Sequence, residues 1–373
     1  MKRIIELLMV IAFITTALFL GCAKKESEVI KIGVIAPLTG DAATYGVDLK
    51  KGMDLAVEEI NTYGGVKGKK IELIYEDSKA DPKTAVSAMN KLISIDKVKI
   101  VLGDMFSATT LAMAPIAERS KVVLLSPTAS AEAVPNAGDY IFTIFPSDVY
   151  EGKILASFIM NKYKGEDIGI IYPQADVMAT IREEFKATVE KLGGKIVFEE
   201  SYIRGISDFR SMLTKMKRSK AEIVFLPTYL DDMAKILRES KELGIDLQFV
   251  TISTALDERL FKLAGNAAEN LIFSAPFYDP NSDLPMIREF VHSFEKKYGQ
   301  VPNIWAAYGY DVVNIAALAL DNSTKNHTEI KEKLLKIKDY PGVTGKTSFK
   351  ENGGVEKSLN IMTVKDQKFV KLQ

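Results

Sequence analysis

The chain has 373 residues and a hydrophobic fraction of 47%, enough for the cores of about two domains. It carries 49 basic and 49 acidic residues, so the formal net charge is zero and the general electrostatic reason to expect nucleic-acid binding is removed. One cysteine and two histidines exclude an internal disulfide and a cysteine-based zinc site. These counts point away from metalloenzymes and towards a protein that binds a ligand.

The N-terminal segment has the pattern of a secretory signal. Two basic residues precede an apolar run, residues 7–20, and Gly21 stands before the lone cysteine, Cys22. This order of a basic start, an apolar stretch and a small residue is typical of a cleaved signal, and the run is short for a membrane span with flanks. Residues 1–21 resemble a lipoprotein signal, after which Cys22 becomes the lipidated N-terminus, although Phe19 stands where such signals favour leucine.

An uncleaved N-terminal anchor is the alternative to this interpretation. Both place the protein outside the cytoplasm, in the periplasm or on the outer cell surface. Residues 22–28 are polar and predict a short flexible tether. The rest of the chain has no second apolar run of membrane length.

From residue 30 onward, strand-like and helix-like patterns alternate along the chain. The first predicted set is strand 30–36, helix 46–61, strand 71–75, helix 81–95, strand 100–103, helix 107–119 and strand 122–125. The rhythm then restarts with helix 148–163, strand 168–172, helix 177–192, strand 195–199, helix 208–217, strand 223–226, helix 231–243 and strand 248–252. Regular alternation of this kind predicts parallel sheets with helices on both faces, and its repetition predicts two doubly wound lobes.

The C-terminal third is less periodic. Its predicted elements are helices 286–298, 304–320 and 330–337 and strands 347–349, 359–364 and 368–371.

Motifs of common enzyme chemistry are incomplete. Gly345–Thr347 resembles the end of a phosphate-binding loop, but Tyr340 stands where that motif needs glycine. The first strand is not followed by a dinucleotide fingerprint, and the chain has no nucleophile elbow. His292 and His327 are expected at the surface. A carboxylate pair for acid–base work stays open, because acidic residues are abundant, but no spacing marks one.

Two hydroxyl-rich loops follow neighbouring predicted strands. Ligands of α/β sheets bind outside the carboxyl ends of the strands. Ser107 stands at a predicted helix start, where unpaired N–H groups favour an anion. The next loop, residues 126–131, contains Ser130. Together the loops predict a carboxylate site without a buried arginine; helix capping by Ser107 and turn formation by Ser130 are the structural alternatives.

Short segments throughout the chain match one family. Jointly they resemble the leucine/isoleucine/valine-binding family of periplasmic substrate-binding proteins, which serve ABC importers, over essentially the whole mature chain. The segments are 32–40, 45–46, 56–61, 64–68, 75–78, 81–82, 114–118, 126–127 and 307–311.

This resemblance implies two lobes joined by a hinge with three crossings. The first lobe is expected to comprise residues 29–147 with 276–345, and the second residues 148–275 with 346–373. The resemblance implies no cofactor and no covalent chemistry.

The resemblance also implies a ligand site. Ser107 and Ser130 would hold a ligand carboxylate, the latter with hydroxyl and backbone N–H. The carbonyl of Thr128 would accept from an ammonium group, and Tyr45 and Tyr229 would line the pocket from opposite lobes.

Two positions depart from the family. Val177 stands where members commonly have tyrosine, and Ser253 stands where the branched-chain binders use a glutamate to neutralise the ammonium. Because an unpaired buried ammonium is costly, either another acid substitutes or the ligand has no amine. Asp104 and Asp176 are the candidate acids.

We therefore expect a substrate-binding lipoprotein that takes an apolar, branched-chain type amino acid to the permease and ATPase subunits of an ABC importer. Its membrane attachment would be the lipid on Cys22, and nucleic acid is not an expected partner. A small carboxylate or amide without an ammonium group is the alternative ligand. A ligand-sensing receptor module and an enzyme with an unrecognised carboxylate pair are the alternative functions.

Overall fold

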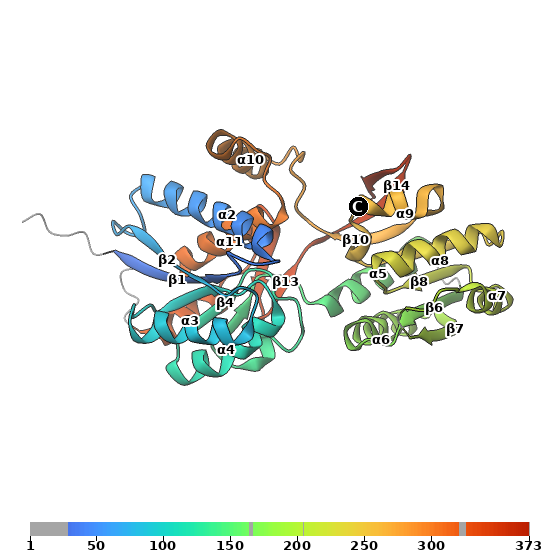
Figure 1. Ribbon diagram of the computed structural model, residues 1–373, viewed down its shortest axis with the longest axis horizontal. Helices are drawn as coiled ribbons and strands as arrows, with labels where there is room; N and C mark the ends of the chain where they lie inside the picture. Colours follow the sequence, from blue (N-terminus) through green and yellow to red (C-terminus); the bar gives the residue numbers. More distant parts are fainter. Residues whose placement is uncertain (1–28, 164–166, 204, 321–325, 373) are drawn as a thin grey trace, which may run out of the picture.

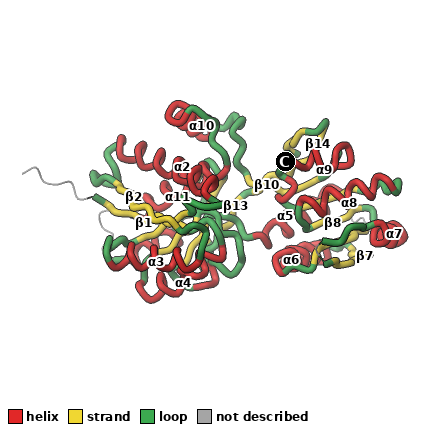
Figure 2. Tube along the Cα trace, in the orientation of Figure 1, coloured by secondary structure: helices red, strands yellow, loops and turns green. Residues whose placement is uncertain are grey.

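A computed structural model describes residues 29–163, 167–203, 205–320 and 326–372. They form two α/β lobes that lie side by side along the longest axis and are joined near its middle (Figure 1). Helices cover both faces of each main sheet (Figure 2). The prediction of two doubly wound lobes is confirmed. The predicted signal and tether lie outside the described residues.

The first lobe contains a five-stranded parallel sheet in the order β2-β1-β3-β4-β5. Its first elements are β1 (Ile30–Ala36), α2 (Ala43–Thr62), β2 (Ile71–Asp77), α3 (Pro82–Ser94), β3 (Ile100–Gly103), α4 (Ser107–Ser120), β4 (Val123–Ser126), η1 (Pro135–Ala137) and β5 (Ile141–Thr143). The chain later returns to this lobe as α10 (Pro285–Tyr298), α11 (Ile304–Ala319), α12 (His327–Leu335) and a small antiparallel sheet of β11 (Tyr340–Gly342), β12 (Gly345–Phe349) and β13 (Val355–Lys357).

The second lobe repeats this arrangement. Its sheet contains β7-β6-β8-β9-β10, which is the same order as in the first lobe, and antiparallel β14 and β15 extend the β10 edge. The elements are α5 (Asp148–Tyr163), β6 (Asp167–Pro173), α6 (Asp176–Lys191), β7 (Lys195–Tyr202), α7 (Arg210–Arg218), β8 (Ile223–Leu226), α8 (Leu230–Glu242), β9 (Gln248–Thr251), η2 (Ser253–Ala255), α9 (Arg259–Ala264), η3 (Gly265–Ala268), β10 (Ile272–Pro276), β14 (Leu359–Lys365) and β15 (Lys368–Lys371).

The central strands are apolar on both faces because each face is covered by helices. In β1, Ile32 and Val34 pack in the core that includes α2 and α11, whereas Ile35 packs in the opposite core with α3 and α4. Helix α3 shows how a predicted boundary arises: Pro82 occupies its first turn, and the carboxylate of Asp81 accepts a hydrogen bond from the N–H of Thr84 at 2.8 Å.

Three connections join the lobes, as the family resemblance implies. They follow β5, β10 and β13. The third lies at Ser358, later than the expected boundary at 345/346, because β12 pairs with both β11 and β13 and because Phe349 and Val355 pack in the core of the first lobe. Strands β5 and β10 were not expected from the sequence, since each is a short apolar run without a clear alternating pattern.

Close to the third connection, the first lobe buries an aspartate. Asp311 of α11 is fully buried and accepts hydrogen bonds from the N–H groups of Val343 and Thr344, at 3.0 and 2.8 Å, and from the Thr344 hydroxyl. Burial raises the pKa of Asp311, and the attraction to Lys357 opposes this rise.

Lys357, the last residue of β13, is the cationic partner of this aspartate. Its side chain is 2% exposed, donates to the Thr347 hydroxyl at 2.8 Å and lies 5.0 Å from the ring centroid of Tyr308. Burial lowers the pKa of Lys357 to about 8, and Asp311 opposes this shift. The lysine that directly precedes a crossing is thereby fixed within the first lobe.

This lowered pKa gives a pH dependence of stability. The unfolded lysine keeps its proton up to its ordinary value of 10.5, whereas the folded one loses it near 8. The free energy of unfolding of the wild type, relative to Lys357→Met, should therefore rise by about 1–2 kcal/mol between pH 8 and 9.5. Urea unfolding of both proteins at several pH values measures this. Lys346→Met, at an exposed position on β12, is the control: its difference from the wild type in free energy of unfolding should stay constant over this pH range. If the free energies of unfolding of Lys357→Met and wild type change in parallel with pH, the lowered pKa of Lys357 is contradicted.

Candidate ligand-binding site

A pocket of about 350 Å³ lies at the carboxyl edge of the first lobe's sheet. In the strand order of this sheet, β1 lies between β2 and β3, so the helices that follow β1 and β3 cover opposite faces. Such a switch point is where ligands of open α/β sheets bind. The pocket is lined by residues that follow β1, β3 and β4 and by one from α11: Tyr45, Met105, Phe106, Ser107, Thr128, Ser130 and Trp305.

Four predicted site residues meet in this pocket. Ser107, Thr128, Ser130 and Tyr45 all line it. Ser107 is the first residue of α4, a helix of 14 residues, and its hydroxyl oxygen accepts a hydrogen bond from the N–H of Ala131 at 3.1 Å. This bond joins the loops that follow β3 and β4, so the two hydroxyl-rich loops lie side by side. Their hydroxyls and the α4 N-terminus present donors suited to a carboxylate.

The loop after β4 is tied to its surroundings by hydroxyl groups. Ser126 donates to the carbonyl of Asp104 at 2.7 Å and accepts from the N–H of Ala129 at 2.9 Å. Thr128 donates to the carbonyl of Met105 at 2.9 Å, and Thr143 donates to that of Ala129 at 2.8 Å. Side-chain bonds therefore fix the shape of the pocket before a ligand arrives.

Asp104 lies behind the pocket and does not line it. Its side chain is fully buried, and one carboxylate oxygen accepts from the N–H groups of Met105 and Phe106. Burial raises the pKa of Asp104, while hydrogen bonding, with Ser78 foremost, acts in the opposite direction. The structure therefore shows Asp104 shaping the loop that carries Ser107.

Aromatic side chains form the apolar wall of the pocket. Tyr45 and Trp305 make an edge-to-face contact, with ring centroids 5.5 Å apart. Phe106, which is 37% exposed, adds a further apolar surface. Neither Trp305 nor Phe106 was predicted; Trp305 reaches the pocket because the fold brings α11 beside the start of α2. The sequence signal available for Trp305 was that it is the only tryptophan of the chain.

The predicted residues of the second lobe lie at the corresponding edge. Val177 follows β6 in the first turn of α6 and is exposed, Tyr229 follows β8 and precedes α8, and Ser253 follows β9. The first two flank the switch point between β6 and β8. In each lobe, one strand leads from this edge directly into a crossing. This strand is β5 in the first lobe and β10 in the second. The side chain of Asp176 lies outside the described part of the structure.

Ser253 contacts a buried acid that the sequence reasoning missed. Glu151 of α5 is 8% exposed and accepts from the Ser253 N–H and hydroxyl, both at 2.8 Å, and from the Ser274 hydroxyl at 2.6 Å. Its only sequence signal is its place in the first turn of a predicted helix. The resemblance implies a glutamate at the position of Ser253, and the structure instead brings a carboxylate to that serine from α5.

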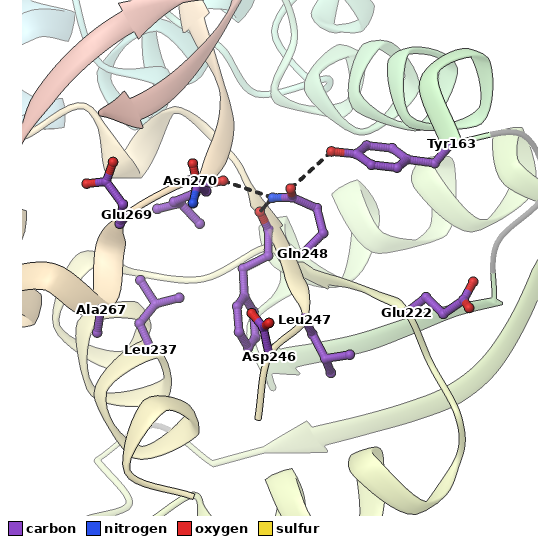
Figure 3. Close-up of a pocket in the computed structure, with 11 residues that line it drawn as sticks. Tyr163, Glu222, Leu237, Asp246, Leu247, Gln248, Ala267, Glu269 and Asn270 are labelled. Atoms are coloured by element: carbon purple, nitrogen blue, oxygen red, sulfur yellow. Dashed lines mark hydrogen bonds between the residues drawn. The ribbon is translucent and has the colours of Figure 1, made fainter. Parts of the chain in front are cut away.

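A second pocket, of about 480 Å³, lies at the opposite, amino edge of the second lobe's sheet (Figure 3). Gln248 crosses it, accepting from the Tyr163 hydroxyl at 3.0 Å and donating to the Asn270 carbonyl at 2.9 Å. None of the predicted site residues lines this pocket. Its position away from the crossings separates it from the candidate site.

Among the residues that the structure describes, no group of three or more His, Cys, Asp or Glu side chains is arranged to hold a metal ion. Nor does any helix there have the length and apolar character needed to cross a bilayer. Cys22, the predicted lipid attachment point, lies outside the described residues.

Comparison with known sequences agrees with this architecture. A protein from Pseudomonas aeruginosa named leucine-, isoleucine-, valine-, threonine- and alanine-binding protein is 28% identical over 331 residues, covering 88% of each chain. Among solved structures, the branched-chain amino acid transporter substrate binding protein LivJ from Streptococcus pneumoniae, in complex with isoleucine, is 32% identical with a TM-score of 0.71, covering 92% of this chain and 100% of the other.

A putative branched-chain amino acid ABC transporter protein from Rhodospirillum rubrum has a TM-score of 0.85 at 25% identity, with the same coverage. The family model described as periplasmic binding protein matches residues 29–368, nearly the whole described chain. The chain therefore belongs to the periplasmic binding protein family.

Proposed function

We propose that this protein is the extracytoplasmic substrate-binding lipoprotein of an ABC importer and that it binds an apolar, branched-chain type amino acid between its two lobes. The observation that carries the ligand class is the pocket of the first lobe, in which two hydroxyl loops meet an aromatic wall. The names of the relatives support the same class, since one is an amino-acid-binding protein and the other is the substrate binding protein of a branched-chain amino acid transporter.

In the proposed complex, the ligand first binds the first lobe. Its carboxylate accepts hydrogen bonds from Ser107 and Ser130, and its apolar side chain packs against Tyr45 and Trp305. The second lobe then rotates about the three crossings and covers the ligand. Closure excludes water and so strengthens the polar contacts. The ligand is released unchanged to the permease when the lobes separate.

The serine pair tests this site. Ser107→Ala and Ser130→Ala should each weaken binding of the preferred apolar amino acid by about 1–3 kcal/mol, because each removes a hydrogen bond to a charged group. Titration calorimetry of the full chain in mild detergent measures this effect. Ser87→Ala, at an exposed site on α3, is the matched control and should bind as the wild type does. Unchanged affinity in both site variants would show that the ligand's carboxylate does not bind in this pocket.

Trp305 gives an independent test of where the ligand sits. It is the only tryptophan of the chain and lines the pocket, so its fluorescence reports on this site alone. Saturation with the ligand should shift its emission to shorter wavelength, as ligand and second lobe exclude water from the indole. Trp305→Phe keeps an aromatic wall and should still bind ligand by calorimetry without the optical signal. Calorimetric binding to the wild type with an unmoved emission spectrum would place the ligand elsewhere.

The lipoprotein assignment is tested at Cys22. Wild type expressed in a bacterium should enter the detergent phase of a phase-separating extract, because its acyl chains add apolar area, and its mass should show loss of residues 1–21. Cys22→Ser should lose both the lipid and this cleavage. Equal, full-length masses in the two proteins would instead show the uncleaved N-terminal anchor.

The alternative ligand class is a small carboxylate or amide without an ammonium group. Val177 and Ser253, in place of a tyrosine and a glutamate, are the observations that favour it. The two ligand classes differ in whether the ligand has an ammonium group, so they are distinguished by whether the site supplies an acid to pair with it.

A further inference from the structure

We propose that Glu151 is the counter-ion of the ligand's ammonium group, so that the transported ligand is a zwitterionic α-amino acid. This inference rests on the proposed function and determines which of its two ligand classes applies. It assigns the acid to α5, an element on which no site residue was expected.

The position of Glu151 is the first part of the argument. It lies in the first turn of α5, directly after the first crossing, and its carboxylate reaches residues of the second lobe's sheet edge. Ser253 follows the carboxyl end of β9, and Ser274 lies in β10, the strand that leads into the second crossing. The carboxylate is thus held between two connections of the hinge, at the edge of the second lobe that carries Val177 and Tyr229.

The hydrogen bonds of Glu151 are the second part. One oxygen accepts from the Ser253 hydroxyl, and the other accepts from the Ser253 N–H and the Ser274 hydroxyl. These three donors are neutral hydroxyl and N–H groups, and they orient the carboxylate. An acceptor-only group held by three donors in a site that is 8% exposed is well fixed to receive a cation.

Charge complementarity between the lobes is the third part. The first lobe offers hydroxyls and a helix N-terminus, which suit the negative end of a ligand. The second lobe offers Glu151, which suits the positive end. A zwitterion therefore gains a contact from the second lobe that a deaminated acid lacks, and closure over a ligand without an ammonium group would bury a carboxylate with no ligand charge to meet it.

Asp104, a candidate acid from the sequence, is less suited to this role. Asp104 is buried behind the pocket, where its carboxylate holds the loop that carries Ser107. Ser253 itself has no charge, and its hydroxyl donates to Glu151. The pair Ser253 and Glu151 therefore supplies together the acid that the resemblance implies at residue 253 alone.

The experiment compares amino acids with their deaminated counterparts. Wild type and Glu151→Gln, as full chains in mild detergent, are titrated with L-leucine and 4-methylpentanoate, L-isoleucine and 3-methylpentanoate, and L-valine and 3-methylbutanoate. Wild type should prefer the amino acid of its best pair by tenfold or more. Glu151→Gln should lose about 10- to 100-fold in affinity for that amino acid, as for a lost bond between charged groups, with no more than about threefold loss for the deaminated acid.

Two further variants separate charge from structure. Glu151→Asp keeps the charge and should retain part of the preference for the amino acid. Glu222→Gln, an exposed glutamate at the opposite edge of the same lobe, makes the same change of charge and should bind both ligands as the wild type does. Thermal unfolding of each variant checks that the fold is intact.

The outcomes for the two proposals differ. An unchanged amino-acid preference in Glu151→Gln, or an equal loss for both members of a pair, would overturn the role of Glu151 and leave the proposed function standing. If Glu151→Gln does not fold, the Glu151→Asp variant decides, because a preference wholly unaffected by shortening the acid would also contradict the assignment. Wild type that binds none of the six compounds would instead contradict the proposed ligand class itself.

Discussion

The parallel pairing of one strand with two neighbours determines where the pocket of the first lobe forms. Strand β1 lies between β2 and β3, and the helices that follow β1 and β3 cover opposite faces of the sheet. The loops diverge at that point, and the hollow between them becomes the pocket with Ser107 and Ser130. In the second lobe, β6 has the same place between β7 and β8, which sets Val177 and Tyr229 at the equivalent edge. One topological constraint thus prepares both halves of the proposed site.

The hydrogen-bond donors that line the pocket of the first lobe are neutral, which suits a protein that must release its ligand. Hydroxyl and N–H groups recognise a carboxylate without leaving a buried, unpaired cation when the ligand departs. The hydroxyls of Ser126 and Thr128 are engaged in holding the loops, so the pocket needs little reordering to bind. Rigid loops and uncharged donors favour reversible binding with the ligand left unchanged, which agrees with a transport role.

The sequence predicts the features that arise from local pattern, and fewer of those that arise from long-range packing. The helical spacing over residues 46–61 matches α2, and the rule on carboxyl ends anticipates the contact between the Ser107 and Ser130 loops. Trp305 and Glu151 could not be placed in this way. Each reaches its neighbours only after α11 packs on α2 or α5 packs over the ends of β9 and β10, and neither contact leaves a local signature in the sequence.

The division of the ligand contacts between the two lobes determines how closure is coupled to ligand binding. A ligand shifts the lobes towards the closed state only by as much as it binds that state more tightly. Contacts made by the first lobe alone stabilise the separated and the closed states alike, and so they contribute affinity without driving closure. In the proposed complex the contact with Glu151 forms only when the second lobe arrives. Carboxylate recognition by the first lobe would then set how well a compound is captured, and ammonium recognition by the second would set whether capture leads to closure. A deaminated acid would accordingly occupy the pocket yet close the lobes poorly, so that selectivity for transport exceeds selectivity for the first encounter.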